Sequence, residues 1–543
     1  MTMTEPATRS PRRILRWLFD SQDGAPGRLI PRWLFLRALA LIYFSAFYSL
    51  LFQIRGLIGP QGILPAGQYL AAVEQALGPA RFWFAPTLLW FSCGSAMLLA
   101  LCWIGIAASV AALLNLWPRL SFFVCFVCYL SFVAAAGDFS GYQSDGMLLE
   151  AGFLALFFSP GGLRPGWGAA TPPSRASLFL LQWEWFRIYF ESGMVKLLSG
   201  DEQWRNFTAM DNYYQNGPLP TWVGWYVEHL PHWFHAATAG ATLGLELVLV
   251  LLLFFPRRLR ILCFLIVTPW EIGVILTANY TFLNYLVLSL GVLLLDDQAL
   301  RRFVPKFLHW NEPTAMEPPT ATPEEVGEQA DRKGLAGHWD ALRLAVSAVL
   351  LTWIAYATTA ELLMMPQHVL RLPTFPIRAL EPFRIANQYG LFAVMTRGRY
   401  EIEFQGSNDG EHWTAYPFRY KPQALDEHPG IYAPYQPRFD WNLWFASLGD
   451  WRQNNLVPLA EEHLLENDRD VLSLFRFNPF SSAPPKYVRA QLWQYWFTSL
   501  SEKHQTGNWW RRQLLGLYAP EITRQPDGKI AVVQWPDQLP EHN

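Results

Sequence analysis

The chain has 543 residues, of which 52% are hydrophobic and 16% are charged. Soluble globular proteins carry charge on roughly a quarter of their residues, so this composition indicates a membrane protein that is long enough for an additional domain. The formal net charge of −2 excludes a strongly basic surface and gives no reason to expect nucleic acid as a partner.

Apolar segments that reach or approach the roughly 20 residues of a membrane span recur up to residue 362. The first follows a basic N-terminus and lacks a cleavage site, which indicates a retained span rather than a signal peptide. The second is over-long and is expected to break at Gly94 or Gly105. Because the fourth and eighth segments are short, the predicted fold class is an α-helical polytopic membrane bundle of about eight or nine spans. The predicted spans are Trp33–Leu51, Thr87–Leu116, Leu120–Ala136, Met147–Ser159, Ser177–Leu198, Thr238–Phe255, Ile261–Thr277, Phe282–Leu295 and Leu342–Leu362.

Basic residues are unevenly distributed among the predicted loops, and this predicts the orientation of the bundle. Six arginines precede the first span, and with nine spans the other basic loops lie on the same, cytosolic side. Residues 1–32 are therefore predicted to be cytosolic and residues 33–311 to be a multi-pass membrane domain. Residues 312–340 are predicted to be an acidic, proline-rich cytosolic linker that is disordered. The last transmembrane helix at 341–362 then leads to an extracytosolic soluble domain at 363–543.

The C-terminal domain is predicted to have an α+β fold. Apolar and polar residues alternate over 400–405, which is typical of a half-buried strand. The turn residues GSNDG at 406–410 can connect it to a second strand at 413–420, so the sheet is expected to contain a β-hairpin. After Asp440 the pattern becomes helical.

Tryptophan is unusually frequent in this domain and has two interpretations. It can form the apolar core, or it can form an exposed aromatic surface that binds the apolar part of a client protein. The candidates for client binding are Trp441, Trp444, Trp493, Trp496, Trp509 and Trp510.

The predicted fifth span, Ser177–Leu198, contains charges, although one charge at the centre of a bilayer costs roughly 2.5–3.5 kcal/mol on insertion scales. Glu184, Arg187 and Glu191 are spaced i, i+3 and i+7 and therefore form one stripe on the helix. Lys196 points about 140° away from Glu191 and must face a different neighbour.

Three further acidic residues, Glu150, Glu246 and Glu271, lie in neighbouring spans. A bundle that brings them together would surround Arg187 and Lys196 with carboxylates. Three interpretations remain open. The charges can be ion pairs that fix helix register, or they can reach the outer interface by snorkelling. They can also line an outward-facing polar cavity in which Lys196 acts as a base or anchors a ligand.

The polar loop Asp201–Pro220 follows this helix and is expected to stay near the membrane surface, next to a short amphipathic helix at Trp222–Phe234. His232 and His235 are three residues apart, but no third ligand has a matching spacing, so no metal site is predicted. The sequence contains no P-loop, no GxSxG, no HExxH and no GxGxxG after a strand. No cofactor is therefore predicted.

Extended motifs occur in both parts of the chain. In the membrane part they are SDGMLLEAGFLALFFSP (Ser144–Pro160), SGMVKLLSGDEQWRNFTAM (Ser192–Met210) and ANYTFLNYL (Ala278–Leu286). In the C-terminal domain they are FQGSNDGEHWTAYPFRYKP (Phe404–Pro422), PYQPRFDWNLWFASL (Pro434–Leu448), LFRFNPFSSAPPKYVRAQLWQYWFT (Leu474–Thr498) and NWWRR (Asn508–Arg512). Together these motifs, which cover nearly the whole chain in order, are similar to the lipase maturation factor family.

The resemblance implies a multi-pass membrane protein, resident in the endoplasmic reticulum in animals, that helps secreted lipases reach their active folded or dimeric state. It implies a non-enzymatic factor whose partners are the lipid bilayer and a secreted client protein. Within Asp201–Pro220 it gives a signature loop that consists of Asp201, Trp204, Arg205, Asp211, Tyr214, Pro218 and Pro220. The preference for arginine over lysine indicates a GC-rich bacterial genome, and hence a bacterial inner membrane. The oligomeric state is not predicted.

Two positions depart from the family pattern, since Tyr213 stands where the family tends to have histidine and Ser144 where it tends to have tryptophan. The segment from Val195 to Trp204 also looks distantly like the membrane fold of the vitamin K-dependent carboxylase, in which a lysine is the base that acts on a quinol cofactor. The alternative function is therefore an integral-membrane enzyme that acts on a lipid-soluble substrate with Lys196 as base.

Overall fold

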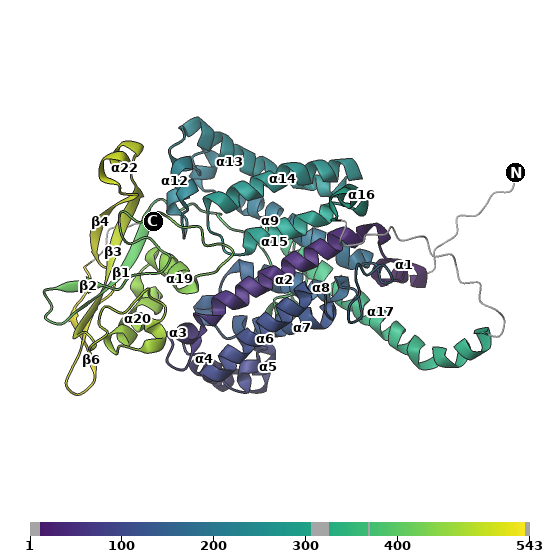
Figure 1. The fold of residues 1–543 in the computed structure, drawn as a ribbon, viewed down its shortest axis with the longest axis horizontal. Coiled ribbons are helices and arrows are strands. Elements are labelled where there is room, and N and C mark those ends of the chain that lie inside the picture. Colours follow the sequence, from purple (N-terminus) through teal and green to yellow (C-terminus); the bar gives the residue numbers. More distant parts are fainter. Residues whose placement is uncertain (1–10, 306–324, 367–369, 538–543) are drawn as a thin grey trace.

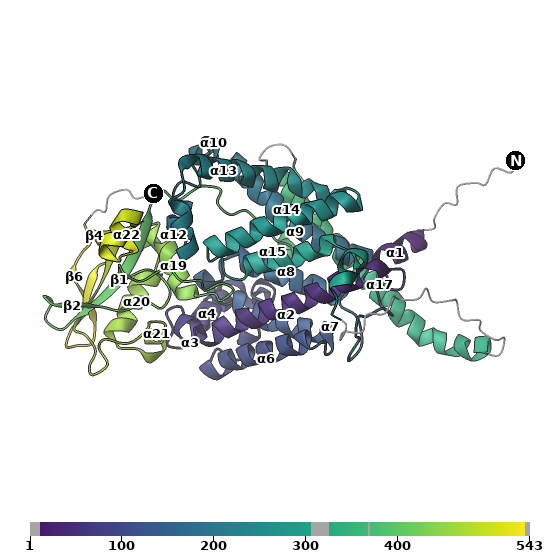
Figure 2. The same ribbon diagram turned by 45° about the horizontal axis from the view of Figure 1, so that its top comes forward.

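The structure is a computed structural model that describes residues 11–305, 325–366 and 370–537. It consists of a helical bundle, built by the chain up to residue 366, and a C-terminal domain that contains a β-sheet (Figure 1). Two helices of the C-terminal domain, α19 (Arg438–Ser447) and α20 (Leu456–Leu465), lie between the sheet and the bundle in both views (Figure 2). The bundle therefore contacts the helical layer of the domain.

Among the described residues, five helices are long and apolar enough to cross a membrane, and a bent pair of helices makes a sixth candidate. The chain is thus a multi-pass membrane protein, and the predicted count of eight or nine spans is not confirmed. Three of the five are α6 (Ser95–Leu113), α14 (Arg257–Thr277) and the part His338–Met364 of α17 (Glu325–Met364). The fourth, Pro26–Leu51, contains η1 (Pro26–Arg28) and α2 (Leu29–Leu51). The fifth, His232–Phe254, contains α13 (His232–Leu247) and η5 (Leu249–Phe254). The bent pair consists of Leu283–Leu294 and Asp297–Phe303, and the chain bends by 105° between them.

Three predicted spans fall outside this count because they are short or charged. The helices α7 (Pro118–Val133) and α8 (Gln143–Phe158) have 16 residues each, whereas α9 (Arg175–Leu198) has 24 residues but contains the predicted charged stripe. The helix α9 packs against α8, α13, α17 and α15 (Leu283–Gly291). The charged helix is therefore an inner element of the bundle, surrounded by other helices.

Shorter helices connect and cap the long ones. The over-long second segment is broken at Gly94, so that η3 (Leu88–Trp90) precedes α6. The segment predicted as one amphipathic helix forms two, because α12 (Trp222–Glu228) ends before Pro231 and α13 begins after it. The remaining short helices of the bundle are α1 (Pro11–Phe19), α3 (Ile54–Ile58), α4 (Ala66–Leu77), η2 (Gly78–Ala80), α5 (Arg81–Phe84), η4 (Gly137–Ser140), α10 (Glu202–Arg205), α11 (Tyr213–Asn216), η6 (Val292–Leu294), α16 (Asp297–Leu300) and η7 (Arg301–Phe303).

The C-terminal domain contains one antiparallel sheet with the strand order β2-β1-β3-β5-β6, and β4 also pairs with β3. The strands are β1 (Arg399–Ser407), β2 (Trp413–Ala415), β3 (Tyr487–Phe497), β4 (Trp510–Leu517), β5 (Glu521–Arg524) and β6 (Ile530–Gln534). The other helices of this part are α18 (Phe375–Leu380), η9 (Glu381–Phe383), η10 (Trp451–Gln453), α21 (Arg469–Leu472) and α22 (Leu500–Thr506).

The predicted β-hairpin is confirmed, since β1 and β2 pair across the turn with Ser407 opposite Trp413. The prediction that β1 is half-buried is wrong, because both of its faces are covered. On the polar face, Glu401 forms an ion pair with Lys421 at 2.8 Å, and Glu403 forms one with Arg512 at 3.0 Å. Alternation in the sequence predicts which face of a strand is polar, but it does not predict whether that face is exposed. Ion pairs allow a charged face to be buried.

The described helix α17 begins at Glu325, inside the stretch that is predicted to be a disordered linker. The first part of that linker, up to residue 324, lies outside the described residues. The last predicted span, Leu342–Leu362, lies within α17 as expected.

Candidate functional site

The charged stripe of α9 is centred on Arg187, whose side chain is fully buried. Its guanidinium forms a buried ion pair with Glu150 of α8 and lies 4.0 Å from the Glu191 carboxylate. It also donates a hydrogen bond of 2.5 Å to the carbonyl oxygen of Asn387, which lies in the segment that leads into the C-terminal domain. The stripe therefore joins two membrane helices to that segment.

The carboxylates of the stripe bind the same segment through its backbone. The backbone N–H and the side-chain amide of Asn387 donate to Glu150 at 3.0 and 3.2 Å, and the backbone N–H of Tyr389 donates to Glu191 at 2.6 Å. Glu184 is the exception, because its fully buried carboxyl group has no hydrogen-bond partner among the described residues. Two of the three predicted acids nearest to Arg187 thus hold one irregular segment in place.

Lys196 lies in a second group, as its angular offset from the stripe predicts. Its ammonium group donates to both carboxylate oxygens of Glu246 on α13 at 2.8 Å and to the Ser192 hydroxyl at 2.6 Å. It also lies 5.2 Å from the centre of the Trp204 ring. Glu271 of α14 accepts a hydrogen bond of 2.5 Å from Tyr189. The seven predicted charges therefore form two groups, and the lysine is ion-paired.

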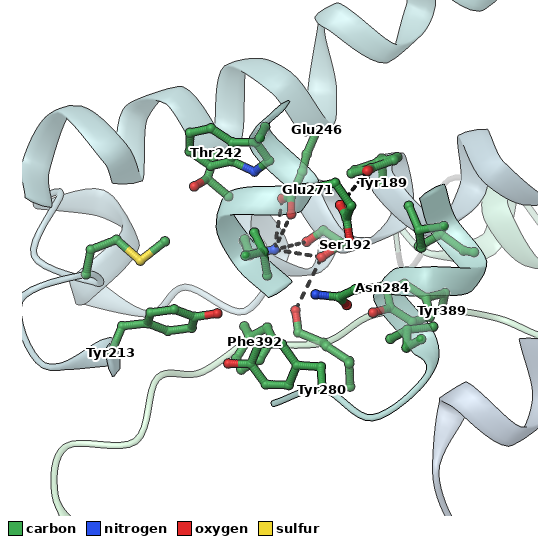
Figure 3. Close-up of a pocket in the computed structure, with 18 of the residues that line it drawn as sticks. Tyr189, Ser192, Tyr213, Thr242, Glu246, Glu271, Tyr280, Asn284, Tyr389 and Phe392 are labelled. Atoms are coloured by element: carbon green, nitrogen blue, oxygen red, sulfur yellow. Dashed lines mark hydrogen bonds and ion pairs between the residues drawn. The ribbon is translucent and has the colours of Figure 1, made fainter. Parts of the chain in front are cut away.

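The second group borders a cavity of about 110 Å³, which we call the inner cavity (Figure 3). Helices α9, α13, α14 and α15 form its walls together with the segment around Phe392. Three further tyrosines, Tyr213, Tyr280 and Tyr389, line it from outside these four helices. Burial raises the pKa of the Tyr213 and Tyr389 hydroxyls, so both stay protonated and act as neutral hydrogen-bonding groups.

The signature loop binds the C-terminal domain. The Asp201 carboxylate accepts from the backbone N–H of Met395 at 2.8 Å, and the Trp204 indole donates to the carbonyl of Phe392 at 2.9 Å. The Pro218 carbonyl accepts from Arg399 at the start of β1 at 3.1 Å.

The other loop residues have more local roles. Tyr214 packs with Trp225 in a cluster that includes residues of β3. Asp211 accepts from His232 at 2.9 Å, Pro220 forms an isolated bridge with Ala278, and Arg205 is exposed. Three of the seven signature residues, namely Asp201, Trp204 and Pro218, form hydrogen bonds with the C-terminal domain, and Tyr214 shares a hydrophobic cluster with it.

A third buried charge group is not predicted from the sequence. Arg438 of α19 binds Asp145 of α8 with two hydrogen bonds of 2.8 Å, and both side chains are fully buried. The Tyr129 hydroxyl donates to Asp145 at 2.7 Å. Asp145 and Arg438 lie in the SDG and RFDW stretches of two of the quoted motifs, which is the only signal in the sequence for this pair.

The candidate client-binding tryptophans divide into two sets. Trp441, Trp444 and Trp510 are buried, whereas the other three are partly exposed. Each of the partly exposed rings is covered on one face by a cation: Trp493 by Arg512 at 3.9 Å, Trp496 by Arg511 at 5.6 Å and Trp509 by Lys503 at 3.6 Å. The aromatic surface available to a partner is therefore smaller than the sequence suggests. Within the described residues no group of three or more His, Cys, Asp or Glu side chains has a metal-binding arrangement.

The chain matches two family profiles in succession. The family described as lipase maturation factor transmembrane domain matches residues 30–302, and the family described as lipase maturation factor C-terminal domain matches residues 385–520. No solved structure matches the chain.

Curated relatives match over nearly the whole chain. It is 32% identical to lipase maturation factor 2 of Gallus gallus over 95% of this chain and 85% of the relative. It is 31% identical to lipase maturation factor 1 of Bos taurus over 95% of this chain and 94% of the relative. Identity to lipase maturation factor 2 of Homo sapiens is 32% over 92% of this chain and 83% of the relative.

Proposed function

The chain belongs to the lipase maturation factor family, and we propose that it is a membrane-resident maturation factor that assists the folding or assembly of secreted proteins, with a lipase as client. The observation that carries this proposal is the match to relatives of that name across both the bundle and the C-terminal domain. The structure supports it through the buried Arg438–Asp145 pair, which holds the domain on the bundle. A domain fixed in this way can present a client-binding surface at a constant position above the membrane.

We propose that nine helices cross the membrane, with α7, α8, α9 and α15 completing the five long ones. The short helices α7 and α8 lie inside the bundle, and the charges of α9 have protein partners, which lowers the cost of burying them. The basic clusters near Arg32, Arg175, Arg257 and Arg301 belong to the end that carries α1 and α16, opposite the C-terminal domain (Figure 1). This distribution supports a cytosolic N-terminus and an extracytosolic C-terminal domain. We propose a bacterial inner membrane as the location, on the arginine-rich composition alone.

We propose that clients bind at the partly exposed rings of Trp493, Trp496 and Trp509, which lie on β3 and just before β4 (Figure 1). Trp493 and Trp496 are three residues apart on one strand, so they lie on opposite faces of the sheet. Trp509 also packs against Trp225 of α12, with the two ring centroids 5.2 Å apart. The buried Trp441, Trp444 and Trp510 are available to a partner only through conformational change. This makes the partly exposed set the better target for mutation.

The alternative, an enzyme with Lys196 as base, has weaker support. A base needs an amine that is free to accept a proton, whereas the Lys196 ammonium is held by Glu246 and Ser192. The pair is better suited to fixing α9 against α13.

Deletion of the encoding gene, with complementation by wild-type and variant genes, tests the proposed function. We expect the specific activity of at least one secreted lipase to fall, and to return with the wild-type gene. Trp496→Ala should complement poorly, whereas the control Trp339→Ala should complement fully, since Trp339 is exposed on α17 at the other end of the molecule. Secreted activities and abundances that do not change on deletion would refute the function. A C-terminal alkaline phosphatase fusion tests the topology separately, because the enzyme is active only outside the cytosol.

A further inference from the structure

The inner cavity is adjacent to a larger one at the junction of bundle and C-terminal domain. This outer cavity has a volume of about 450 Å³ and is lined by the start of α8, by Trp441 and Phe445 of α19, and by Tyr142. The two cavities share Tyr280, Leu283 and Leu391 in their walls. The two cavities are therefore adjacent, and together they extend from the domain junction to the Lys196–Glu246 pair.

Each cavity contains a buried hydrogen-bond donor that has no acceptor among the described residues. In the inner cavity it is the side-chain amide nitrogen of Asn284, a residue that is 7% exposed. In the outer cavity it is the indole nitrogen of Trp441, which is 8% exposed. Figure 3 shows Asn284 between Ser192 and Tyr280 in the inner cavity. A buried donor without an acceptor is costly, so both groups favour an acceptor within the cavities.

The charges around the cavities determine which acceptors fit. Lys196, the cation of the inner cavity, is already paired with Glu246, and Glu271 adds a second carboxylate. An anionic ligand such as a phosphate or a free fatty acid would therefore meet an excess of negative groups. The free donors are neutral, and they match an uncharged oxygen such as the carbonyl of an ester.

Most of the remaining lining surface is apolar or aromatic, with Leu283, Leu391 and Phe445 in the outer cavity, although polar side chains such as Gln143 and Asn442 also line it. Such walls bind hydrocarbon, with a small number of polar groups that fix its orientation. The bilayer around the bundle supplies molecules with this combination at high local concentration.

We propose that the two adjacent cavities together bind an uncharged acyl ester of the bilayer, of the diacylglycerol class, whose ester oxygens accept hydrogen bonds from Asn284 and Trp441. The acyl part of the ligand lies against the aromatic wall formed by Tyr142 and Phe445. This site is distinct from client binding on the sheet, and it does not depend on the proposed function.

The test is photolabelling of the purified full-length chain in detergent with a photoreactive diacylglycerol analogue. We expect saturable labelling of peptides from α15 and α19, competed by unlabelled diacylglycerol but not by equal amounts of phosphatidylcholine or phosphatidic acid. Asn284→Leu and Trp441→Phe each remove one donor and should weaken binding about three- to tenfold, which is the loss expected for one hydrogen bond. Trp451→Phe is the matched control, because its indole nitrogen is also buried with no partner in the described part of the chain but lies outside both cavities.

A further variant covers the case in which a donor variant does not fold. Leu391→Trp adds volume where the two cavities meet and should abolish saturable labelling while leaving both donors in place. Each variant is used only if it is monodisperse with an unchanged unfolding temperature. Equal labelling of wild type and the folded donor variants would overturn the proposal. The proposal would also be overturned if the phospholipids competed as well as diacylglycerol. It would be overturned as well if wild type showed no saturable labelling, because water would then fill the cavities.

Discussion

Removal of Arg438 is expected to release the C-terminal domain from the bundle. In Arg438→Met the Asp145 carboxylate loses two hydrogen bonds of 2.8 Å and keeps only the Tyr129 hydroxyl as a donor. Both side chains of the pair are fully buried, so no water can replace the guanidinium without rearrangement. Breaking a buried pair by removing one partner typically costs about 3–5 kcal/mol. We expect a loss of stability in this range.

A double-mutant cycle measures the interaction. The cycle uses Arg438→Met, Asp145→Asn and the double variant, each purified in detergent and unfolded with denaturant. The double variant leaves no uncompensated charge, and the side-chain carbonyl introduced by Asp145→Asn can still accept from Tyr129. It should therefore be more stable than Arg438→Met, with a coupling energy of at least about 2 kcal/mol. Protease accessibility of the junction around residue 390 should follow the same order.

An exposed pair of the same residue types in the same domain serves as the control. Arg452 binds Asp450 at 3.0 Å, and their side chains are 63% and 46% exposed. Arg452→Met should change stability by about 0–1 kcal/mol, as is typical of surface pairs. If Arg438→Met and Arg452→Met cost the same, or if the cycle is additive within about 0.5 kcal/mol, then the buried pair does not hold the two parts together.

Three further variants test other parts of the structure. Lys196→Met leaves the Glu246 carboxylate buried without its cation, so it should lower the yield of monodisperse protein in size-exclusion chromatography. Adding Glu246→Gln should restore the yield, and full yield of the single variant would contradict the structural role. Burial raises the pKa of the Asp440 carboxyl from 3.8 to about 6, so the folded chain binds this proton more tightly than the unfolded chain. The resulting stability is complete below about pH 4 and is lost as the pH rises through 6, a change of roughly 3 kcal/mol that Asp440→Asn should remove from the pH dependence of unfolding. Gly105→Val in α6 would place its Cβ about 2.5 Å from a phenylalanine ring of α2, whereas a Cβ at Gly273 of α14 meets nothing within 4 Å. The first should therefore reduce folded yield and the second should not, and equal yields would show that α2 and α6 can separate at no cost.

The sequence predicts residues with unusual chemistry better than it predicts their partners. The spacing of Glu184, Arg187 and Glu191 identifies a charged stripe, and the 140° offset of Lys196 separates it from that stripe. Which acids bind Arg187 depends on the packing of α8 and on the path of the chain after α17, neither of which leaves a local pattern. For the same reason the Arg438–Asp145 pair, which links residues 293 positions apart, could not be predicted from spacing.

Secondary structure was predictable where a local pattern decides it. The hairpin of β1 and β2 follows from alternation and the turn at 406–410. The sequence offers Gly94 or Gly105 for the break in the second segment, and the structure breaks at Gly94, whereas Gly105 lies within α6. Exposure was less predictable, because burial of β1 on its polar face depends on Lys421 and Arg512, which come from other elements. The tryptophans show the same limit: Trp441 and Trp510 occur in polar sequence contexts but are buried by tertiary packing.

The contacts of the Arg187 stripe explain why charges occur within the bundle. Irregular backbone at the depth of a membrane is tolerated only where protein groups satisfy its N–H and C=O groups. The segment around Asn387 and Tyr389 has such a backbone, and it meets α9 at Arg187, close to the middle of that helix. Arg187 binds its carbonyl group, and Glu150 and Glu191 bind its N–H groups. The stripe therefore allows the C-terminal domain to extend an irregular segment into the bundle, and its loss should free that segment even where each transmembrane helix still forms.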